Sequence, residues 1–293
     1  MQLLEGKIVS QAVKDELRLL TNDLKNQQKK TPHLAAILIG TDGASETYVA
    51  SKIKNCEEVG FKSSLYRFDA TVEEATVIEQ INQLNNDDDV DGILVQLPLP
   101  KHFSEEKIVN LIDPGKDVDG FHPVSVGRMV QGLPTFLPAT PYGIMLMLKH
   151  YNIDTAGKHA VVIGRSNIVG RPMSILLSQP TNPGNCTVTL CHSRTQNLKD
   201  ICLQADIIVA ALGNVRFLTA DMVKENAIVI DVGITRVKDE NKKSGFSIVG
   251  DVDFDNVAPR CSYITPVPGG VGLMTIAALL KNTYNASQQK NNS

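Results

Sequence analysis

The chain has 293 residues, of which 42% are hydrophobic and 21% charged, a composition typical of a globular protein with about two domains. Its formal net charge of −3 at pH 7 argues against nucleic acid or an anionic membrane surface as the main partner. The apolar runs, such as LAAILI and IIVAAL, are far shorter than the roughly 20 residues that a membrane-spanning helix needs.

The first part of the chain alternates short apolar runs with longer segments of helical period. After an amphipathic helix at the N-terminus, strands are predicted at HLAAILIG (33–40), SLYRF (64–68) and the start of DGILVQLPLP (91–100). Helices are predicted at about 43–59, where Gly60 ends the helix, at 72–84, and at 104–112, where Ser104 is a typical N-cap. This βαβαβα order implies a parallel sheet covered by helices.

A second alternation follows a stretch without regular period. Residues 113–141 are rich in Gly and Pro, and we interpret them as the crossing between two domains. Beyond a helix near 142–151, the patterns predict strands at 158–164, 186–192, 205–212 and 227–234, and helices at 168–179 and 197–204. The polar segment 237–246 is typical of an exposed hairpin tip.

The sequence therefore predicts an α/β protein of two domains. Residues 1–140 would form an N-terminal βαβ catalytic domain, and 141–271 a C-terminal Rossmann-like dinucleotide-binding domain. A final helix over 272–285 is expected to pack back on the first domain, and 286–293 are expected to form a disordered tail.

The segment AVVIGRSNIVGRP has the strand, glycine turn and helix start of a nucleotide-binding loop. It departs from G-x-G-x-x-G, because Ser166 stands at the second glycine position and Gly170 comes one residue late. Gly164 still permits a tight turn, Ser166 is small, and the helix N-terminus attracts anions. A P-loop is excluded, because five residues separate the glycines and Arg171 follows them. An ordinary strand–helix turn remains an alternative.

The end of the next strand indicates which dinucleotide this loop would bind. An NAD site places Asp or Glu there to hold the ribose hydroxyls, but TLCHSRT offers His192, Ser193 and Arg194. Arg194, joined by Arg165, suits a 2′-phosphate, which favours NADP over NAD. The alternative is that both arginines are solvated surface charges.

Tyr48 and Lys52 lie four residues apart on the predicted helix 43–59 and therefore share one face. The apolar Val49 and Ile53 would form the neighbouring, inward stripe. An amphipathic helix with a solvated lysine would give the same spacing, so the pair alone does not establish a site.

Several other patterns are rejected as sites. Asp87, Asp89, Asp91 and Gly92 begin like a calcium loop, but the closing Glu is replaced by Pro98. The histidines lack zinc spacing, and the five cysteines form no C-x-x-C pair, which favours reduced thiols. With no signal-peptide or transit pattern at the N-terminus, we expect a cytoplasmic protein.

Nine segments, taken together and in this order, resemble the bifunctional methylenetetrahydrofolate dehydrogenase/methenyltetrahydrofolate cyclohydrolase family over nearly the whole chain. They are YVASKIKNCEEVG, DGILVQLPLPKH, PGKDVDGFHP, PATPYGI, VVIGRSNIVGRPM, VTLCHSRT, IVIDVGI, IVGDVDF and SYITPVPGGVGLMT. The family also uses a glycine–x–serine turn at Ser166. Departures are modest: Ala139 replaces a usual Cys, Leu273 a usual Pro, and Gly43 stands where Pro is common.

The resemblance implies roles for residues of both predicted domains. Tyr48 would stack on the pterin, Lys52 would be the central catalytic group oriented by Gln96, and Asp119 would hold the pterin's amino edge. The residues expected to contact NADP are Gly164, Arg165, Ser166, Ser193 and Ile234, together with Arg194. The loop 266–272, with Pro268, Gly269, Gly270 and Gly272, would close over nicotinamide and folate. The family also implies a homodimer.

The chemistry implied by the resemblance fits these residues. Removing a hydride from methylene-tetrahydrofolate moves no proton, whereas hydrolysis of the methenyl product needs a base. A lysine in a closed interdomain cleft, beside a cationic intermediate, would lose its proton more easily and could serve. Two alternatives remain open: a shikimate-type dehydrogenase, which would need a Lys–Asp pair acting on a hydroxyl, and a non-catalytic folate or nucleotide binder.

Overall fold

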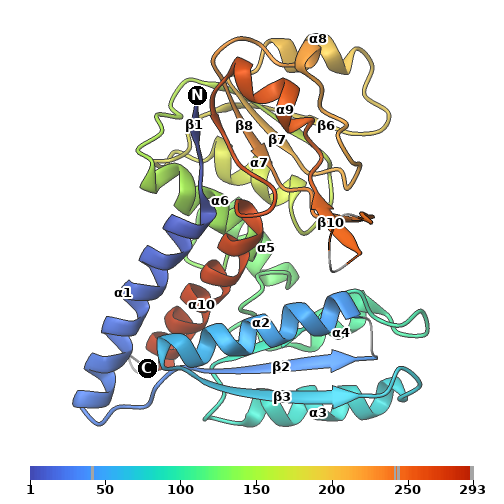
Figure 1. Cartoon of the computed structure of the whole chain (residues 1–293). Helices are drawn as coiled ribbons and strands as arrows, with labels where there is room; N and C mark the ends of the chain where they lie inside the picture. The colour runs from blue at the N-terminus through green and yellow to red at the C-terminus, as the bar shows by residue number, and fades with distance from the viewer. Residues whose placement is uncertain (41–42, 241, 243–244, 291–293) are drawn as a thin grey trace. The chain divides into compact units, whose positions relative to one another are not determined.

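The computed structural model describes residues 1–40, 43–240, 242 and 245–290, which form two compact units (Figure 1). One unit comprises Met1–Ser10 and Thr140–Thr275 and is called here the six-stranded unit. The other comprises 11–139 and 276–290 and is called the three-stranded unit. None of the described helices is both long enough and apolar enough to span a membrane.

The three-stranded unit is built on a parallel sheet of order β3-β2-β4, with β2 (His33–Ile39) in the centre. The outer strands are β3 (Lys62–Phe68) and β4 (Gly92–Val95). Helix α2 (Gly43–Val59) covers one face and α3 (Glu74–Asn86) the other (Figure 1). Every residue of β2 is buried, because a central parallel strand has both faces covered, and its apolar sequence follows from that burial.

Two predicted helix boundaries of this unit, at Gly60 and Ser104, are confirmed, whereas the helix predicted at 72–84 runs from Glu74 to Asn86. Gly60 follows α2 with a φ of +82°, the left-handed conformation that glycine adopts at no steric cost. Helix α4 (Glu105–Leu111) begins after Ser104, whose Oγ accepts a hydrogen bond from the Lys107 N–H at 3.3 Å.

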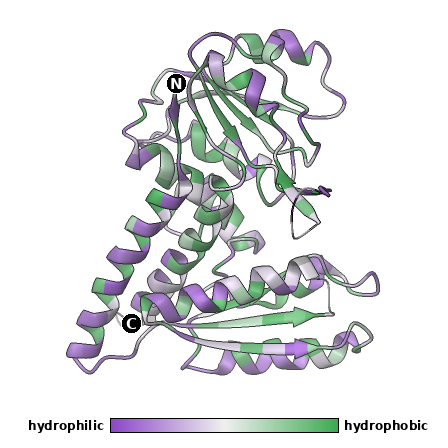
Figure 2. Ribbon diagram, viewed as in Figure 1, coloured by the Kyte–Doolittle hydropathy of each residue, from purple (hydrophilic) through white to green (hydrophobic). Residues whose placement is uncertain are grey.

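Many apolar residues of the three-stranded unit pack against one face of its sheet. Figure 2 shows β2 largely in hydrophobic colours, while α2 and α3 alternate between polar and apolar residues. The buried core between the sheet and α3 includes Ile37, Val77, Ile81, Ile93 and Ile108. This core holds the carboxyl ends of the three strands in place, and the candidate catalytic residues lie around those ends.

The six-stranded unit has the order β1-β11-β8-β7-β5-β6, with every neighbouring pair parallel. The strands are β1 (Gln2–Leu3), β5 (His159–Ile163), β6 (Thr187–Cys191), β7 (Ile207–Ala210), β8 (Ala227–Asp231) and β11 (Cys261–Ile264). The chain passes from β5 to β6 on one side and then returns to β7 on the other. The point between β5 and β7 is therefore the topological switch at which doubly wound sheets bind ligands. The α/β class and the Rossmann-like second domain are confirmed.

Helices connect and flank this sheet. They are α6 (Ala139–His150), α7 (Gly170–Ser178), α8 (Leu198–Leu203) and the short α9 (Phe254–Val257). Strands β9 (Thr235–Lys238) and β10 (Phe246–Val249) form an antiparallel hairpin at the predicted position. Residues 241, 243 and 244 of the predicted tip lie outside the described residues.

Several elements differ from the prediction, and strand β11 and the short helix α9 had no predicted counterpart. The N-terminus begins with β1 before α1 (Gly6–Asn26), and β1 joins the six-stranded unit because it pairs with β11. Two residues are too few to show a strand period. The crossing 113–141 contains helix α5 (Pro123–Val130), which its Gly and Pro content concealed, although Pro is favoured in a first helical turn.

The C-terminal helix is longer than predicted. Helix α10 runs from Val271 to Lys290, so 286–290 are helical where a disordered tail was expected. The reason is burial, because Ala286 and Ser287 are only 2% and 4% exposed. Within the three-stranded unit, the Asn282 side chain donates to the carbonyls of Val118 and Leu137 at 2.8 and 2.9 Å.

Candidate active site

Lys52 is a buried lysine in the middle of α2. Its side chain is 8% exposed, and its Nζ donates to Gln96 Oε1 at 3.0 Å. Gln96 directly follows β4, and its backbone N–H donates to the Ile37 carbonyl at 2.9 Å, which continues the β4–β2 ladder. Its side-chain Nε2 donates to the Leu97 carbonyl at 2.7 Å, so the amide is held with its oxygen toward the lysine. The structure thus brings together the predicted Lys52 and Gln96.

The electrostatic surroundings of Lys52 weaken its hold on a proton. Burial lowers the pKa of Lys52, and the nearby acidic groups of Asp119 and Cys56 oppose that shift. Burial raises the pKa of Asp119 to about 6, while the Lys52 charge acts in the opposite direction and Asp117 adds to the rise. Asp119 therefore lies close enough to Lys52 for the two charges to interact.

Asp119 lies in a turn that is held by a second carboxylate. Asp117 is 1% exposed and accepts hydrogen bonds from the backbone N–H groups of Phe121 and His122 and from Ser125 Oγ, the last at 2.7 Å. These bonds join the turn to the beginning of α5. Sequence reasoning singled out Asp119 in KDVDG but missed Asp117, because nothing local shows that the Asp117 carboxylate holds the turn.

Tyr48 lies one helical turn before Lys52 and is 37% exposed, and partial burial raises its pKa. Val49 is fully buried on the neighbouring stripe, as the helical spacing predicted, but Ile53 of the same predicted stripe is only half-buried. One turn after Lys52, Cys56 is also fully buried, and burial raises its pKa to about 12. The Cys56 thiol therefore stays protonated at neutral pH and is unreactive.

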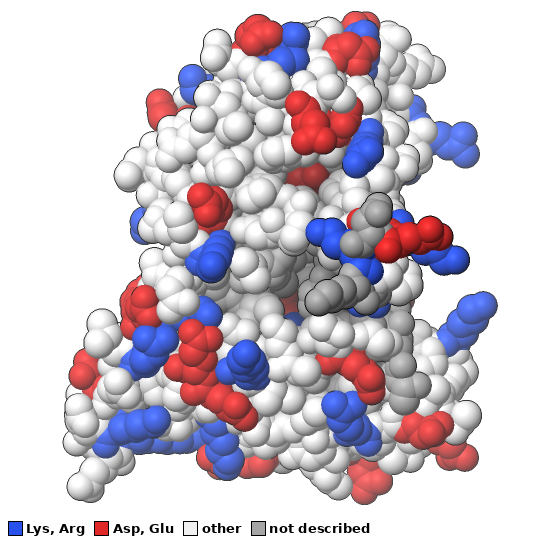
Figure 3. Space-filling model, viewed as in Figure 1, with Lys and Arg blue, Asp and Glu red and all other residues white. Residues whose placement is uncertain are grey.

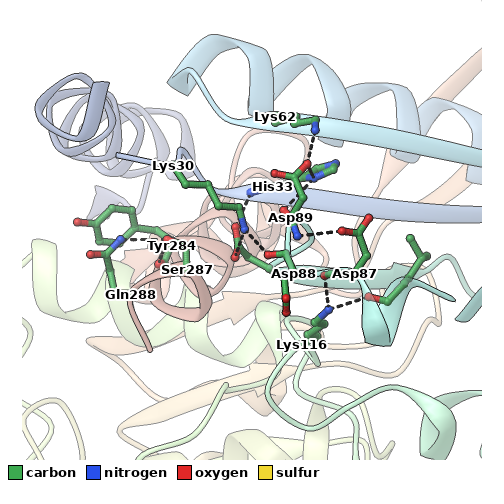
Figure 4. A network of polar contacts seen from close by, with 12 residues as sticks. Lys30, His33, Lys62, Asp87, Asp88, Asp89, Lys116, Tyr284, Ser287 and Gln288 are labelled. Carbon is green, nitrogen blue, oxygen red and sulfur yellow. Dashed lines mark hydrogen bonds and ion pairs between the residues drawn. The ribbon is translucent and has the colours of Figure 1, made fainter. Parts of the chain in front are cut away.

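Two of the three aspartates rejected as a calcium loop form ion pairs with lysines, and the third belongs to the same polar network (Figure 4). Asp91 is buried and accepts from Lys30 Nζ at 2.8 Å, and Asp89 forms an ion pair with Lys62. The carboxylate of Asp87 accepts the Asp89 N–H at 2.9 Å. Among the described residues there is no group of three or more His, Cys, Asp or Glu that could hold a metal ion.

The candidate nucleotide loop lies at the switch point of the six-stranded unit. Gly164 has a φ of +118°, and a Cβ at this position would lie 2.1 Å from the Ala211 carbonyl oxygen. A Cβ on Gly170 would lie 1.9 Å from the Gly164 carbonyl oxygen. Both glycines are therefore required for close backbone approach, and Gly170 fills the third glycine role although it comes one residue late.

Ser166 lies in the turn four residues before α7 begins, and its hydroxyl makes contacts there. Its Oγ accepts from the N–H groups of Val169 and Gly170 at 3.2 and 3.4 Å, so it satisfies orphan donors before the first helical turn. The sequence predicted a small side chain and, through the resemblance, a cofactor contact at Ser166, but not these hydrogen bonds. The Ser166 hydroxyl reaches these N–H groups because Gly164 permits a tight turn before it.

The basic residues that the sequence proposed for a 2′-phosphate are exposed on the same unit. Arg165 follows β5, and Ser193 and Arg194 follow β6, where the turn is closed by a bond from the Thr195 N–H to the His192 carbonyl at 2.8 Å. Within the described chain, neither guanidinium has a carboxylate partner. On the visible surface of each unit, acidic and basic side chains are otherwise intermixed (Figure 3). Two unpaired guanidinium groups beside a nucleotide-type turn fit a phosphate ligand.

The glycine-rich loop after β11 packs on the first turn of α1. Gly269 has a φ of +108°, and its carbonyl accepts the Lys7 N–H at 3.2 Å. A Cβ on Gly270 would lie 2.5 Å from the Pro266 carbonyl oxygen, and the peptide bond before Pro268 is cis. Beside the loop, a Cβ on Gly272 would lie 4.0 Å from Ile234 Cγ2, and Ile234 is 48% exposed. The structure thus places Ile234 next to the predicted loop.

Family models match most of the chain. The model of the tetrahydrofolate dehydrogenase/cyclohydrolase catalytic domain matches residues 4–119, and that of the NAD(P)-binding domain matches residues 138–291. The bifunctional protein FolD of Cytophaga hutchinsonii is 59% identical over 290 residues, covering 99% of this chain and all of that protein. The bifunctional protein FolD of Porphyromonas gingivalis is 58% identical over 287 residues, covering 98% and 97%.

Solved structures agree with these matches. The bifunctional methylenetetrahydrofolate dehydrogenase/cyclohydrolase FolD of Campylobacter jejuni is 50% identical, with a TM-score of 0.93 and 99% coverage of both chains. The Trypanosoma brucei enzyme, solved with NADP cofactor and an inhibitor, is 35% identical, with a TM-score of 0.93 and 99% and 98% coverage. From its motifs, its two units and these likenesses, the chain belongs to the tetrahydrofolate dehydrogenase/cyclohydrolase family.

Proposed function

We propose that this chain oxidises methylene-tetrahydrofolate to methenyl-tetrahydrofolate with NADP, and then hydrolyses the methenyl form to formyl-tetrahydrofolate. Membership of the family supports both activities. The observation that carries the chemistry is the buried Lys52 amine, which is hydrogen-bonded to Gln96 at 3.0 Å and has a lowered pKa.

The first step breaks a C–H bond of the methylene bridge, and both bonding electrons leave with the hydrogen. NADP, when bound, supplies the acceptor of this hydride. The product is a cation delocalised over the bridge carbon and its two nitrogens, so no acid or base is needed. The protein's task is to position donor and acceptor. In this proposal, Arg165 and Arg194 hold the 2′-phosphate. The other cofactor contacts are Gly164, Ser166, Ser193 and Ile234.

The second step adds water to the cationic bridge carbon and then breaks one C–N bond. The neutral Lys52 amine takes a proton from the water as its oxygen bonds to carbon, and it returns a proton to the ring nitrogen that leaves. Gln96 orients the amine without adding charge, so the lowered lysine pKa is kept. A lysine with its ordinary pKa would be almost wholly protonated at neutral pH and would be a poor base.

The folate itself would be held by groups beside Lys52. Tyr48 stacks on the pterin, and the Asp119 carboxylate accepts hydrogen bonds from its amino edge. Because the pKa of Asp119 is about 6, this carboxyl is mostly ionised at neutral pH and can accept these hydrogen bonds with its oxygens. The loop containing Pro268, Gly269, Gly270 and Gly272 would close over the reacting groups. Supporting this, the glycines let its backbone approach neighbouring segments closely.

A spectrophotometric assay tests the proposal. Methylene-tetrahydrofolate and NADP should give reduced nicotinamide, and methenyl-tetrahydrofolate supplied alone should lose its absorbance as it is hydrolysed. Reduction with shikimate but not with folate would favour the alternative dehydrogenase. Binding of folate without turnover would favour a non-catalytic binder, and either outcome would refute the proposal.

We also propose that the chain acts as a homodimer, a state supported by the family resemblance alone. Light scattering after size exclusion should give twice the chain mass of 31.9 kDa. A single-chain mass at micromolar concentration would contradict this part of the proposal.

A further inference from the structure

Two buried carboxylates of the six-stranded unit have no part in the proposed chemistry. Asp231 is the last residue of β8, and Asp251 follows β10 after one glycine. Their side chains are 3% and 0% exposed. Ionised carboxylates are costly to bury unless hydrogen bonds or opposite charges compensate them. Both are compensated by backbone N–H groups, and the position of those groups suggests a role.

Asp251 collects the N–H groups of three consecutive residues. Its Oδ2 accepts from Leu212 at 2.6 Å and from Gly213 at 2.9 Å, while its Oδ1 accepts from Asn214 at 2.8 Å. Three converging N–H groups form the kind of concave anion site that often binds a phosphate. Here the protein's own carboxylate fills that site, so residues 212–214 are fixed by a side chain about 40 positions away in sequence.

Asp231 holds the segment that carries Asp251 and also the turn after β8. Its Oδ1 accepts from the N–H groups of Gly233 and Asp251, both at 2.9 Å, and its Oδ2 accepts from Val252 at 3.0 Å. Burial raises the pKa of Asp231 to about 6, although these backbone bonds lower it, and the neighbouring Asp251 charge adds to the rise. The two carboxylates therefore act as a linked set, called here the Asp231–Asp251 pair.

Glycines beside the pair make the contacts geometrically possible. A Cβ on Gly250 would lie 1.9 Å from Asp231 Oδ2, and a Cβ on Gly233 would lie 2.5 Å from Asp251 Oδ1. Any side chain at either position would displace a carboxylate. The sequences DVG and GDVD thus place each buried carboxylate within reach of a glycine of the other segment.

The segments fixed by the pair lie at the carboxyl edge of the sheet, next to the candidate nucleotide loop. Residues 212–214 follow β7, and the preceding carbonyl, that of Ala211, is the atom that a Cβ on Gly164 would meet at 2.1 Å. Gly233 directly precedes Ile234, a proposed cofactor contact. The pair therefore orders the segments that follow the neighbouring strands β7 and β8.

We propose that the Asp231–Asp251 pair is a positioning element for the NADP site, which sets residues 212–214 and 233–234 before the cofactor binds; this inference rests on the proposed function. Segments that are already ordered cost less conformational entropy when a ligand binds. Neither carboxylate touches the reacting atoms in this proposal, and each acts through the backbone it holds.

The test compares Asp251→Asn with Asp253→Asn. Asn at 251 would point an NH₂ group, which cannot accept a hydrogen bond, toward one or more of the three N–H groups. The segment 212–214 should therefore be held less firmly. Asp253 is a matched control because its carboxylate bonds only the Asn256 side chain among the described residues. We expect Asp251→Asn to raise the KM for NADP by about tenfold with a smaller change in kcat, and Asp253→Asn to leave both within about twofold.

Methenyl hydrolysis measured without cofactor separates positioning from general damage. In Asp251→Asn it should fall less than about twofold, because the residues proposed for hydrolysis lie in the other unit. An equal fall in hydrolysis and in NADP-dependent oxidation, or an unchanged KM for NADP, would overturn the inference.

Hydrogen exchange on the wild-type protein keeps the inference testable if Asp251→Asn does not fold. The N–H groups of Leu212, Gly213 and Asn214 should be protected without cofactor and should gain little protection when NADP binds. Rapid exchange that is slowed only by NADP would overturn the inference. A wild-type protein that shows no NADP-dependent turnover would instead refute the proposed function.

Discussion

Replacing Lys52 with Met removes the amine at the centre of the proposed hydrolysis and keeps a side chain of similar length. Because Lys52 is 8% exposed and its nitrogen is bonded to Gln96, no bulk water can take over its position without rearrangement. A positioned acid–base group contributes about 10²- to 10⁴-fold to a rate, so methenyl hydrolysis should fall by at least about 100-fold. Binding of NADP should not change, because its proposed contacts lie in the six-stranded unit.

The effect on stability should be small, since two contributions oppose each other. Met avoids the cost of burying an ammonium, whereas Gln96 Oε1 loses its donor at a cost of about 1 kcal/mol. The folded-state pKa of Lys52 is lowered, so the wild type carries its burial cost fully below that pKa. This cost diminishes as the pH rises toward the ordinary lysine value. Any stability advantage of the variant should therefore be largest at low pH.

Stopped-flow decay of methenyl absorbance measures the hydrolysis rate, and NADPH titration by fluorescence measures cofactor binding. Lys54→Met is the matched control, because Lys54 lies two residues away on the same helix and is exposed. It should hydrolyse the methenyl substrate within about twofold of wild type. Hydrolysis by Lys52→Met within about threefold of wild type would refute the assignment of Lys52 as the base.

Arg194→Ala should weaken NADP binding relative to NAD binding by about tenfold, because a charge-assisted contact to the phosphate is lost. The control Arg171→Ala should affect the binding of both cofactors alike. The KM values of each variant for NADP and for NAD test this prediction. Asp119→Asn should flatten the pH dependence of stability. The folded pKa of about 6 exceeds the ordinary 3.8, so the wild type gains stability as pH falls from about 6 to 4. The variant should lack that gain, which is on the order of 1–2 kcal/mol in the free energy of unfolding measured with urea. If the free energy of unfolding of the variant depends on pH as steeply as that of the wild type, the prediction is wrong. Gly170→Ala should lower the melting temperature by several degrees, because its Cβ would meet a carbonyl at 1.9 Å. Gly127→Ala, in α5 with open space around the new atom, should raise it slightly, and the reverse order would refute the steric argument.

Most strands and long helices could be predicted because periodicity is a local property. The buried runs of β2 and β5, and the helix that Gly60 ends, follow from residues within one or two turns of each other. Elements that depend on distant partners were missed. The two-residue β1 exists because β11 offers an edge, and α10 extends to Lys290 because its last turns are buried.

The pairing of Lys52 with Gln96 was anticipated, but only through resemblance to a family. The spacing of Tyr48 and Lys52 predicts that they share one face of a helix, but it does not predict which residues pack against that face. Nothing local indicates that the residue after β4 turns its amide oxygen toward the lysine, 44 positions back in the chain. The lowered lysine pKa depends on the same long-range packing, since burial is its first cause.

Each unit fixes a loop with buried carboxylates that are compensated by N–H or hydroxyl donors. Asp117 does this for the turn that presents Asp119, and the Asp231–Asp251 pair does it beside the nucleotide loop. Unlike an ion pair between exposed side chains, such buried bonds are little screened by salt. A carboxylate used in this way can be charged without attracting a lysine into the site. In the proposed hydrolysis, in which a cationic intermediate lies beside the Lys52 amine, N–H compensation therefore orders the loop without adding a competing cation.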